Sequence, residues 1–291
     1  MYSFVIPCYN SSESIRHVVE LTMEEMEKMN RREFEFVLVN DYSSSTKTMP
    51  VLKKLAEEYP CVTVLNLAKN AGQHNAIMAG LNYAKGDILI GMDDDMQTHP
   101  SQLPYLFEEL EKGYDIVYGY YPEKKHSAFR NFGSWVNYIS VRILIGKPKE
   151  LKTSSYWVAR KFVRDSVIEY QAPYAYIQGL FLRTTRNISC IPIQHFQREE
   201  GESNYTFKRL LKLWSNIIGF SITPLRLTEY CGFGLSLLSI IAAVVVLIRK
   251  ILNPAMALGW PSLMIVICFF SGIQLMFLGL IGEYIGRMFL G

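Results

Sequence analysis

Short apolar segments alternate with amphipathic segments through the first 120 residues of the chain. Five segments have the length and composition of buried strands: residues 2–9, 34–41, 62–68, 87–93 and 114–120. Helical patterns fill the intervals, at residues 14–29, 49–59, 73–85 and 100–112. This alternation predicts an α/β domain with a mainly parallel sheet and helices on both faces. Ligands of such sheets bind at the carboxyl ends of the strands, so the residues just after each strand are the candidates for a site.

The last sixty residues are almost entirely apolar. The runs from Cys231 to Ile248 and from Pro261 to Gly282 carry no charge, and each is long enough to cross a hydrocarbon core of about 30 Å as a helix. Residues 227–291 are therefore predicted to form a hairpin of two transmembrane helices, at about 229–250 and 261–284. Two buried core helices are the alternative, which the length and unbroken apolarity disfavour. Glycines at positions 272, 279, 282 and 286 permit close packing with neighbouring helices, which leaves a homo-oligomer open.

Residues 205–226 have an amphipathic pattern. One stripe holds Phe207, Leu210, Leu211, Trp214, Ile217 and Ile218, with lysine and arginine off that stripe. The segment fits a helix in the lipid headgroup region, and packing against the preceding domain fits equally well. Basic residues that precede the first span or follow the second outnumber the two in the turn between the spans (Arg249 and Lys250). This distribution favours a cytoplasmic domain at residues 1–204. The chain opens on a strand with no leader-like pattern, so we expect this domain to stay on the cytoplasmic side.

Bulk composition excludes some functions. The net charge is only +3, which gives no support for a nucleic-acid partner. The five cysteines show no metal-binding spacing, and we expect them to be buried, reduced thiols.

Polar residues follow each of the first four predicted strands. They are Pro7, Tyr9 and Asn10; Asn40, Asp41 and Tyr42; Lys69, Asn70 and Gly72; and finally Asp93, Asp94 and Asp95. Singly, such residues are ordinary helix caps and turn residues. Their recurrence at successive strand ends predicts a nucleotide site at this edge of the sheet.

Three consecutive aspartates follow the fourth strand. In an extended segment residues i and i+2 point to the same side, so Asp93 and Asp95 are expected to converge while Asp94 faces elsewhere. Converging carboxylates are stable when a cation lies between them. Hard oxygen ligands favour Mg²⁺ or Mn²⁺, and Gln97 offers a further carbonyl oxygen in the same alternation.

Several blocks resemble those of family 2 glycosyltransferases, in family order. They are "VIPCYN", "VNDYSSS", "KNAGQHNAIMAGLNYAKGD", "MDDDMQTHP" and "REEGESNYTFKRLLKLWSNIIGFSITPLR". More narrowly, the chain resembles polyprenyl-phosphate sugar transferases and dolichyl-phosphate mannose synthases, and "NAGQHNAIMAG" is similar to undecaprenyl-phosphate aminoarabinose transferases. The resemblance implies the nucleotide-diphospho-sugar transferase fold known as GT-A and runs over nearly the whole chain.

The resemblance also implies roles for individual residues. It makes Asp93, Asp95 and Gln97 the ligands of the metal that holds the donor diphosphate. The nucleotide-sugar site would comprise Pro7, Tyr9, Asn10, Asp41, Asn70, Asp93, Asp94, Arg198 and Ser203. Arg130, Ser134 and Asn137 would meet the acceptor phosphate. Asp93, Asp95, Arg130 and Arg198 would carry the catalysis.

Some positions depart from the family pattern. Gly119 is followed by Tyr120 and Tyr121, where the family has an arginine in the order G-x-R. One contact to the acceptor phosphate is then missing, or Lys124 or Lys125 supplies it. Asn40 stands where an acid is common, and Asn204 stands where a lysine is frequent. Residues 151–161 match the family's sugar-recognition segment only loosely, so the sugar is left undefined.

The resemblance and the chemistry together predict an inverting, metal-dependent transferase. Its donor would be a nucleoside-diphosphate sugar, with UDP favoured, and its acceptor polyprenyl (undecaprenyl) phosphate at the cytoplasmic face of a bacterial inner membrane. Because a lipid monophosphate is already largely ionised, with its second pKa near ~6, the reaction needs no general base. Two alternatives stay open: a family 2 transferase that elongates a glycan chain, and a catalytically silent nucleotide-sugar-binding scaffold.

Overall fold

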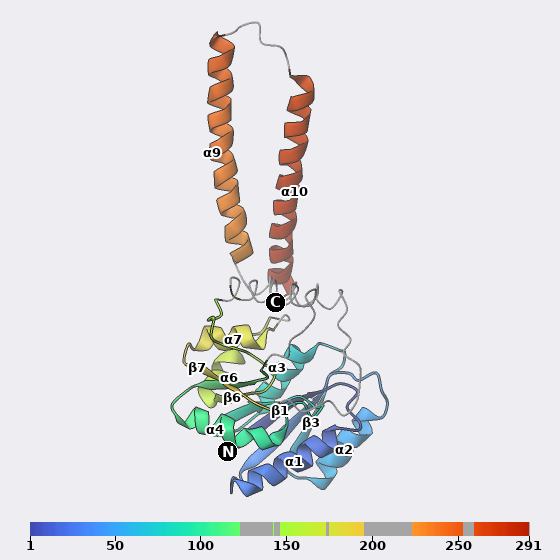
Figure 1. Ribbon diagram of the computed structural model, residues 1–291. Helices are drawn as coiled ribbons and strands as arrows, with labels where there is room; N and C mark the ends of the chain where they lie inside the picture. The colour runs from blue at the N-terminus through green and yellow to red at the C-terminus, as the bar shows by residue number, and fades with distance from the viewer. Residues whose placement is uncertain (123–141, 143–145, 173–174, 195–222, 253–258, 291) are drawn as a thin grey trace. The chain divides into compact units, whose positions relative to one another are not determined.

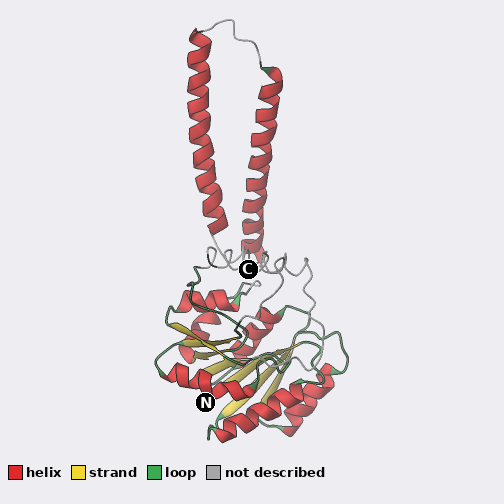
Figure 2. Ribbon diagram, in the orientation of Figure 1, coloured by secondary structure: helices red, strands yellow, loops and turns green. Residues whose placement is uncertain are grey.

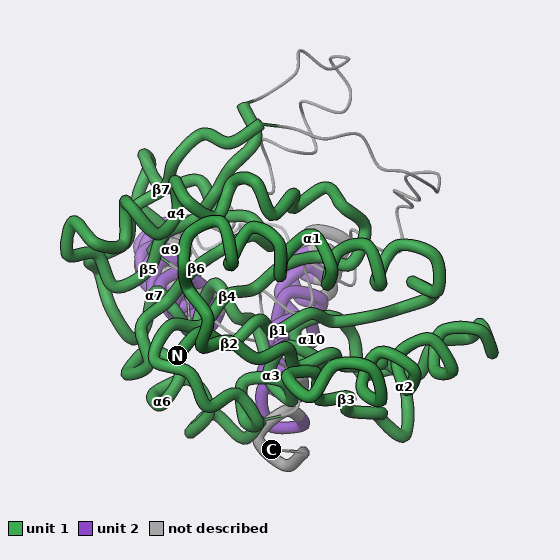
Figure 3. The backbone as a smooth tube through the Cα atoms, turned by 90° about the horizontal axis from the view of Figure 1, so that it is seen from below, with its two compact units in different colours: residues 1–216 green, residues 217–291 purple. Residues whose placement is uncertain are grey.

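The structure is a computed structural model that describes residues 1–122, 142, 146–172, 175–194, 223–252 and 259–290 (Figure 1). The chain divides into two compact units, residues 1–216 and 217–291 (Figure 3). The predicted interface segment lies outside the described residues except for its last four positions, 223–226, which are helical.

One sheet of seven strands organises the first unit. The strands are β1 (Tyr2–Cys8), β2 (Phe34–Asn40), β3 (Val62–Asn66), β4 (Ile88–Gly91), β5 (Ile116–Tyr120), β6 (Trp157–Arg160) and β7 (Ile188–Pro192), in the order β3-β2-β1-β4-β6-β5-β7. β6 pairs antiparallel with both β4 and β5, whereas the remaining pairs are parallel. Six carboxyl ends therefore share one edge of the sheet with the amino end of β6.

The mainly parallel sheet predicted from the alternation is confirmed. All five expected strands and all four expected helices are present, with ends that differ by a few residues at most. No local pattern in the sequence indicated β6 or its antiparallel direction. This strand is short and mixed in composition, and its place between β4 and β5 depends on pairing partners far away in the chain.

Helices cover both faces of the sheet (Figure 2). They are α1 (Ile15–Lys28), α2 (Thr48–Glu58), α3 (Gln73–Tyr83), the 3₁₀ turn η1 (Pro100–Gln102), α4 (Leu103–Glu111), α6 (Lys161–Val167) and α7 (Ile177–Thr184). The buried faces of α1, α2 and α4 form one core with β1 and β2, around residues such as Phe4, Phe36 and Phe107. Helix α3 packs on the same two strands and on α7. Alternate residues of each central strand thus meet different helical layers.

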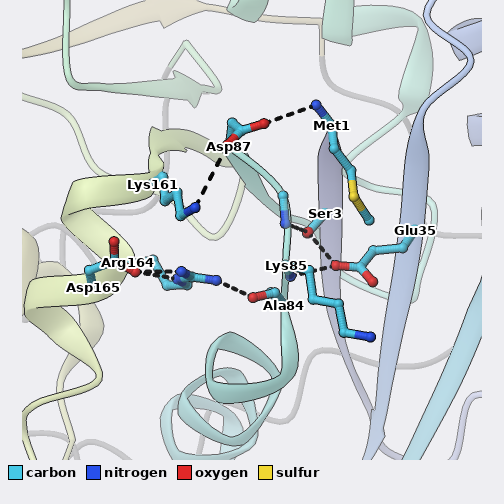
Figure 4. Close-up of polar contacts among 10 residues, drawn as sticks. Met1, Ser3, Glu35, Ala84, Lys85, Asp87, Lys161, Arg164 and Asp165 are labelled. Carbon is cyan, nitrogen blue, oxygen red and sulfur yellow. Dashed lines mark hydrogen bonds and ion pairs between the residues drawn. The ribbon is translucent and has the colours of Figure 1, made fainter.

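Polar contacts tie the amino ends of β1, β2 and β4 together at the edge opposite the predicted site (Figure 4). The Ser3 hydroxyl donates to Glu35 Oε1 at 2.6 Å and accepts from the Gly86 amide at 2.7 Å. The terminal ammonium lies 3.2 Å from Asp87 Oδ2. Asp87 is well exposed, so its ion pairs contribute little to stability.

The second unit contains α9 (Thr223–Leu252) and α10 (Trp260–Leu290). The two expected spans lie in these helices. Among the described residues, one window, Phe269–Gly286 in α10, is long and apolar enough to cross a bilayer by length and composition. A Cβ added at any of the four glycines of α10 would meet no atom within 4 Å. The expectation of close packing between copies stays a prediction.

The prediction of buried cysteines holds for Cys8 and is wrong for three others. Cys61 and Cys190 are partly exposed and Cys231 is exposed, and all four thiols are free. Cys61 precedes β3 and Cys190 lies on β7, and these are the two edge strands of the sheet, where one side faces outward.

Candidate active site

The carboxyl ends of β1 and β2 present a buried carboxylate. Asp41 is 4% exposed and follows the last paired residues of the two strands, Cys8 and Asn40. Its Oδ1 accepts from the Ala71 amide at 2.7 Å and its Oδ2 from the Gly72 amide at 2.9 Å. Each carboxylate oxygen has two lone pairs, so both oxygens retain capacity for a ligand N–H or O–H.

Two further residues shape the turn that Asp41 holds. Asn70 donates from Nδ2 to the Asp41 carbonyl at 3.1 Å. Gly72 has φ +87°, a left-handed conformation that suits glycine, and α3 begins at the next residue. The sequence predictions for Asp41 and Asn70 thus converge on one loop before α3.

Asn40 has a structural task. Its Nδ2 donates to Asn66 Oδ1 at 2.7 Å, and its Oδ1 accepts from the Ser43 hydroxyl at 2.6 Å. The amide therefore joins β2 to β3 and fixes the loop after β2. A carboxylate at this position would lack the donor that bonds Asn66.

The loop after β1 is tied to the loop after β2. Asn10 donates from its backbone to Ser43 Oγ at 3.1 Å and from Nδ2 to Ser44 Oγ at 3.0 Å. Its side-chain oxygen accepts from the Ser45 amide at 2.9 Å. Tyr9 lies at this junction with half of its surface exposed, whereas Pro7 is buried in β1 opposite Val39.

The three aspartates lie in a tight turn after β4. The expected extended geometry is wrong, because β4 ends at Gly91 and Met96 adopts a left-handed φ of 61°. Asp95 Oδ1 accepts from the Gln97 amide at 3.1 Å, which closes the turn locally. Asp94 points to β1, where its Oδ2 accepts from the Tyr9 amide at 3.1 Å.

Asp93 is held by two neutral donors from elements on either side of it. Gln73, the first residue of α3, donates to Oδ1 at 2.9 Å, and the Ser155 hydroxyl donates to Oδ2. Burial raises the pKa of Asp93 to about 7; the Ser155 hydrogen bond lowers it, and the charges of Asp95 and Asp94 raise it further. Burial also raises the pKa of Asp94.

Neither Gln73 nor Ser155 was a sequence candidate. Gln73 had the same signal as its neighbours, a polar residue just after a strand. Ser155 had none, because it reaches Asp93 through the antiparallel pairing of β6 with β4, in which Gly91 lies opposite Trp157. Asp93 lies two residues after Gly91, and Ser155 lies two residues before Trp157, so the two side chains meet beyond the end of this pairing.

Tyr121 occupies the place of the expected arginine. Its hydroxyl donates to the Gln97 carbonyl at 2.6 Å. Burial raises the pKa of Tyr121, and the charges of Asp93 and Asp95 raise it further. The Tyr121 side chain is therefore neutral. It holds the aspartate turn through one hydrogen bond and supplies no positive charge there.

The aspartate turn fits a divalent cation. Asp93 and Asp94 form no ion pair with any residue that the structure describes, and the donors to Asp93 are neutral. Within the described ranges, no group of three or more His, Cys, Asp or Glu side chains is placed to hold a metal alone. The carboxylates of this turn are hard oxygen ligands, and Mg²⁺ or Mn²⁺ at phosphate sites takes only one or two carboxylates from the protein.

Other predicted site residues lie outside the described residues. They are Lys124, Lys125, Arg130, Ser134, Asn137, Arg198, Ser203 and Asn204. The structure thus brings together the donor half of the predicted site: Tyr9, Asn10, Asp41, Asn70, Asp93, Asp94, Asp95 and Gln97.

His74, the second residue of α3, is largely buried and packs edge-on against Tyr176, with ring centroids 5.1 Å apart. Its Nδ1 has no hydrogen-bond partner among the residues that the structure describes, and burial lowers its pKa to about 4. Unfolded chains take up this proton near pH 6.5, so stability should fall as pH drops from 7 to 4, by on the order of 2 kcal/mol through this residue.

Unfolding midpoints of the wild type and His74→Gln across this pH range check the expectation. The variant should show the shallower pH dependence, and His17→Gln, which alters an exposed histidine of α1, should keep the wild-type slope. Equal slopes in all three proteins would refute a neutral, buried His74.

Comparison with known proteins adds to this geometry. Residues 3–170 match the family described as glycosyl transferase family 2. The undecaprenyl-phosphate 4-deoxy-4-formamido-L-arabinose transferase of Pseudomonas syringae pv. syringae is 33% identical over 99% of this chain and 86% of its own length. The transferase of the same name from Edwardsiella ictaluri is also 33% identical, over 99% and 89%.

Solved structures of low sequence identity share the fold. The glucosyl-3-phosphoglycerate synthase of Mycobacterium tuberculosis, crystallised with Mn²⁺, UDP and phosphoglyceric acid, has a TM-score of 0.56 at 18% identity and covers 76% of each chain. Its complex with Mn²⁺ and UDP-glucose has a TM-score of 0.52 at 16% identity, over 76% of this chain and 77% of the other. The sheet is of the GT-A type, and the chain belongs to glycosyl transferase family 2.

Proposed function

We propose that this protein transfers a sugar from a nucleoside diphosphate, with UDP favoured, to polyprenyl phosphate, with inversion at the anomeric carbon. The observation that carries the proposal is the aspartate turn at the carboxyl edge of the sheet. There Asp93 is partly buried and held by two neutral donors, close to the loops that hold Asp41. Relatives aligned over nearly the whole chain are named as undecaprenyl-phosphate transferases, which supports this lipid class as acceptor.

Different residues of the chain would bind the nucleoside and the diphosphate of the donor. Asp41 offers carboxylate oxygens to the nucleoside, and its rigid loop fixes their position. Gln73 and Ser155 hold the Asp93 carboxylate in place. A divalent cation at Asp93 and Asp95, with Gln97 nearby, would bind the donor diphosphate and carry the leaving group's charge. Structural neighbours crystallised with Mn²⁺ and UDP or UDP-glucose support this division.

The transfer step needs no general base from the protein. An ionised phosphate oxygen of the acceptor attacks the anomeric carbon as the bond from that carbon to the diphosphate oxygen breaks. The nucleoside diphosphate leaves with the electron pair, and no proton moves. Arg130, with Ser134 and Asn137, would orient the acceptor phosphate, and Arg198 with Ser203 would close over the diphosphate. These roles rest on the family resemblance.

Membrane attachment fits the substrates. The polyprenyl acceptor stays in the bilayer and the donor is soluble, so the catalytic domain must work at the cytoplasmic face of a bacterial inner membrane. The apolar window of α10 supports one span. We extend this to a hairpin in which α9 also crosses, at about residues 229–250, with residues 205–226 at the interface.

One assay tests the function. The full chain in nanodiscs is given radiolabelled UDP-sugars, undecaprenyl phosphate and Mn²⁺, with and without EDTA. We expect label in the lipid phase that disappears with EDTA. Label only in a sugar polymer would instead indicate glycan elongation. Donor binding without turnover across a panel of UDP-, GDP- and dTDP-sugars would indicate a silent scaffold.

A further inference from the structure

A cavity of about 480 Å³ lies against β7, the outermost strand on one side of the sheet (Figure 1). The loops that hold Asp41 follow β1 and β2, toward the other side. The strands β6 and β5 separate β7 from β4, and three strand spacings amount to about 14 Å. The cavity is therefore distinct from the aspartate turn, and its volume is that of a small-molecule site.

Part of the cavity wall is apolar. Leu151 and Leu182 of α7 are buried side chains, and Ile188 at the start of β7 is partly exposed. They come from three segments of the chain that meet at this side of the sheet. Apolar atoms that face a cavity favour a ligand with a hydrocarbon part.

An arginine borders the same cavity. Arg186 is exposed, and its Nη1 donates to the Gly146 carbonyl at 3.1 Å. It forms no ion pair with any carboxylate of the described residues. A guanidinium has five N–H donors, so most of them are left for a ligand. Their planar fork suits the oxygens of a phosphate or a carboxylate.

Two lysines add positive charge beside the cavity. Lys147 is partly buried, and its Nζ donates to the Thr153 hydroxyl at 2.9 Å. Burial lowers the pKa of Lys147, and the charge of Cys190, which lines the cavity, raises it. An anion in the cavity would stabilise this ammonium further. The Lys152 ammonium lies 4.5 Å from the centre of the Tyr120 ring, and that ring also lines the cavity.

A carboxylate opposes these charges. Glu150 is exposed and belongs to the lining. Against it stand the guanidinium of Arg186 and the two lysines, so the balance of charge at the cavity is positive. Positive charge beside an apolar wall suits a ligand that is both anionic and partly hydrocarbon.

Two walls of the cavity continue into the aspartate turn. Tyr120 lines the cavity, and the next residue, Tyr121, donates a hydrogen bond to this turn. Leu151 lies four residues before Ser155, whose hydroxyl donates to Asp93. A ligand that holds these walls in place therefore also restricts the residues that hold the turn.

We propose that this cavity is an effector site for an amphipathic anion, a phosphate ester with a short hydrocarbon chain. Arg186 binds the phosphate, and the apolar wall binds the chain. Such a group is supplied either by the headgroup end of an anionic lipid or by a soluble organic phosphate. Binding at the cavity is independent of the proposed function, whereas the effect on the aspartate turn rests on it.

Cys190 provides a reporter of occupancy, because it lines the cavity and is a partly exposed free thiol. The full chain in phosphatidylcholine nanodiscs is alkylated with iodoacetamide, with and without hexyl phosphate, and each cysteine is followed by peptide mass spectrometry. Hexyl phosphate at ten times its dissociation constant should slow alkylation of Cys190 about tenfold. Cys61, a partly exposed thiol just before β3, should react at an unchanged rate.

Other probes separate the parts of the ligand. Inorganic phosphate should protect Cys190 only at much higher concentration, because each methylene that leaves water adds about three- to fourfold in affinity. Hexylammonium, which has the opposite charge, should not protect. Nanodiscs that contain phosphatidylglycerol identify the source: protection without added probe indicates a lipid headgroup, and protection by the soluble ester alone indicates an organic phosphate.

Variants of exposed residues test the charges. Arg186→Gln should abolish protection by hexyl phosphate, and Arg186→Lys, which keeps the charge, should retain most of it. Glu150→Gln removes the opposing charge and should strengthen binding. Arg183→Gln is the matched control, because Arg183 is an exposed arginine of α7 outside the lining. Each protein is compared with and without the probe, so a change in the intrinsic reactivity of Cys190 cancels.

Occupancy should also strengthen Mn²⁺ binding. If the ligand restricts the residues around Asp93 in advance, the cation has less conformational freedom to remove. We expect saturating hexyl phosphate to lower the Mn²⁺ concentration at half-saturation about fivefold, and Mn²⁺ to tighten hexyl phosphate binding by the same factor. Electron paramagnetic resonance of free Mn²⁺ measures this without turnover, and Arg186→Gln should show no shift.

The outcomes are distinct. Equal protection in the wild type and Arg186→Gln, equal protection by hexylammonium, or equal slowing of Cys190 and Cys61 would overturn the anion site. Protection that depends on Arg186 but leaves Mn²⁺ binding unchanged would overturn the effector role. A protein that binds no Mn²⁺ and still shows this protection would overturn the proposed metal site and leave the ligand of the cavity standing.

Discussion

Replacement of Asp93 by asparagine is expected to lower sugar transfer by about a thousandfold, equivalent to ~4 kcal/mol of transition-state stabilisation. The amide keeps the shape of the side chain but removes the negative charge that a divalent cation requires. Asp95→Asn should have an effect of similar size. Transfer rates at saturating Mn²⁺, together with the Mn²⁺ concentration at half-maximal activity, provide the measurement.

Unfolding of Asp93→Asn and of the wild type, both measured in EDTA, distinguishes a folding defect from a defect of the site. The Asp93 carboxylate is partly buried and the two donors that hold it, Gln73 and Ser155, are neutral, so the amide should leave the metal-free protein as stable as the wild type or more so. Asp87→Asn is the matched control. It removes an exposed carboxylate just before the same strand, at the opposite edge of the sheet, and should transfer normally (Figure 4). Full activity of Asp93→Asn, or transfer that EDTA leaves intact, would remove the basis for a cation at this turn.

Gly91→Ala is expected to destabilise the first unit by about 3 kcal/mol, which lowers the thermal midpoint by about 8 °C. A Cβ on Gly91 would lie 2.2 Å from Trp157 Cε2. Trp157 is 1% exposed and packs edge-on against Phe181, with ring centroids 4.8 Å apart, so the ring has no room to retreat. Because Gly91 ends β4 directly before the aspartate turn, transfer should fall as well.

A compensating variant tests the cause. Trp157→Leu alone leaves a cavity and should also be destabilising. Combined with Gly91→Ala, it gives the new methyl group space, so the double variant should be at least 1 kcal/mol more stable than the sum of the single effects predicts. Thermal unfolding of the four proteins completes the cycle. Additive effects would show that the alanine acts elsewhere than on Trp157.

Local patterns were enough for much of the fold. The five first strands and four first helices follow from apolar periodicity, which each segment carries by itself, and their alternation led to the parallel sheet. Asp41, Asn70 and the aspartates were found as candidates because they come just after strands. The family resemblance added roles to these positions but no contacts.

Local sequence patterns do not predict the geometry around the aspartates. Alternation predicts an extended segment at residues 93–97, whereas the Asp95–Gln97 hydrogen bond and the left-handed Met96 fold these residues into a turn. Asp94, expected to face away, turned out to bond the Tyr9 amide 85 residues earlier. Each of these contacts depends on which strand lies next to β4.

By itself, then, the sequence determined the first five strands and the first four helices, the position of the three aspartates just after a strand, and the long apolar helices α9 and α10, because each of these depends on neighbours within a few residues. Tertiary structure alone decided that β6 enters between β4 and β5 in the reverse direction. That pairing places Ser155 on Asp93, packs Trp157 against Gly91, and is specified by residues about forty to seventy positions apart in the chain.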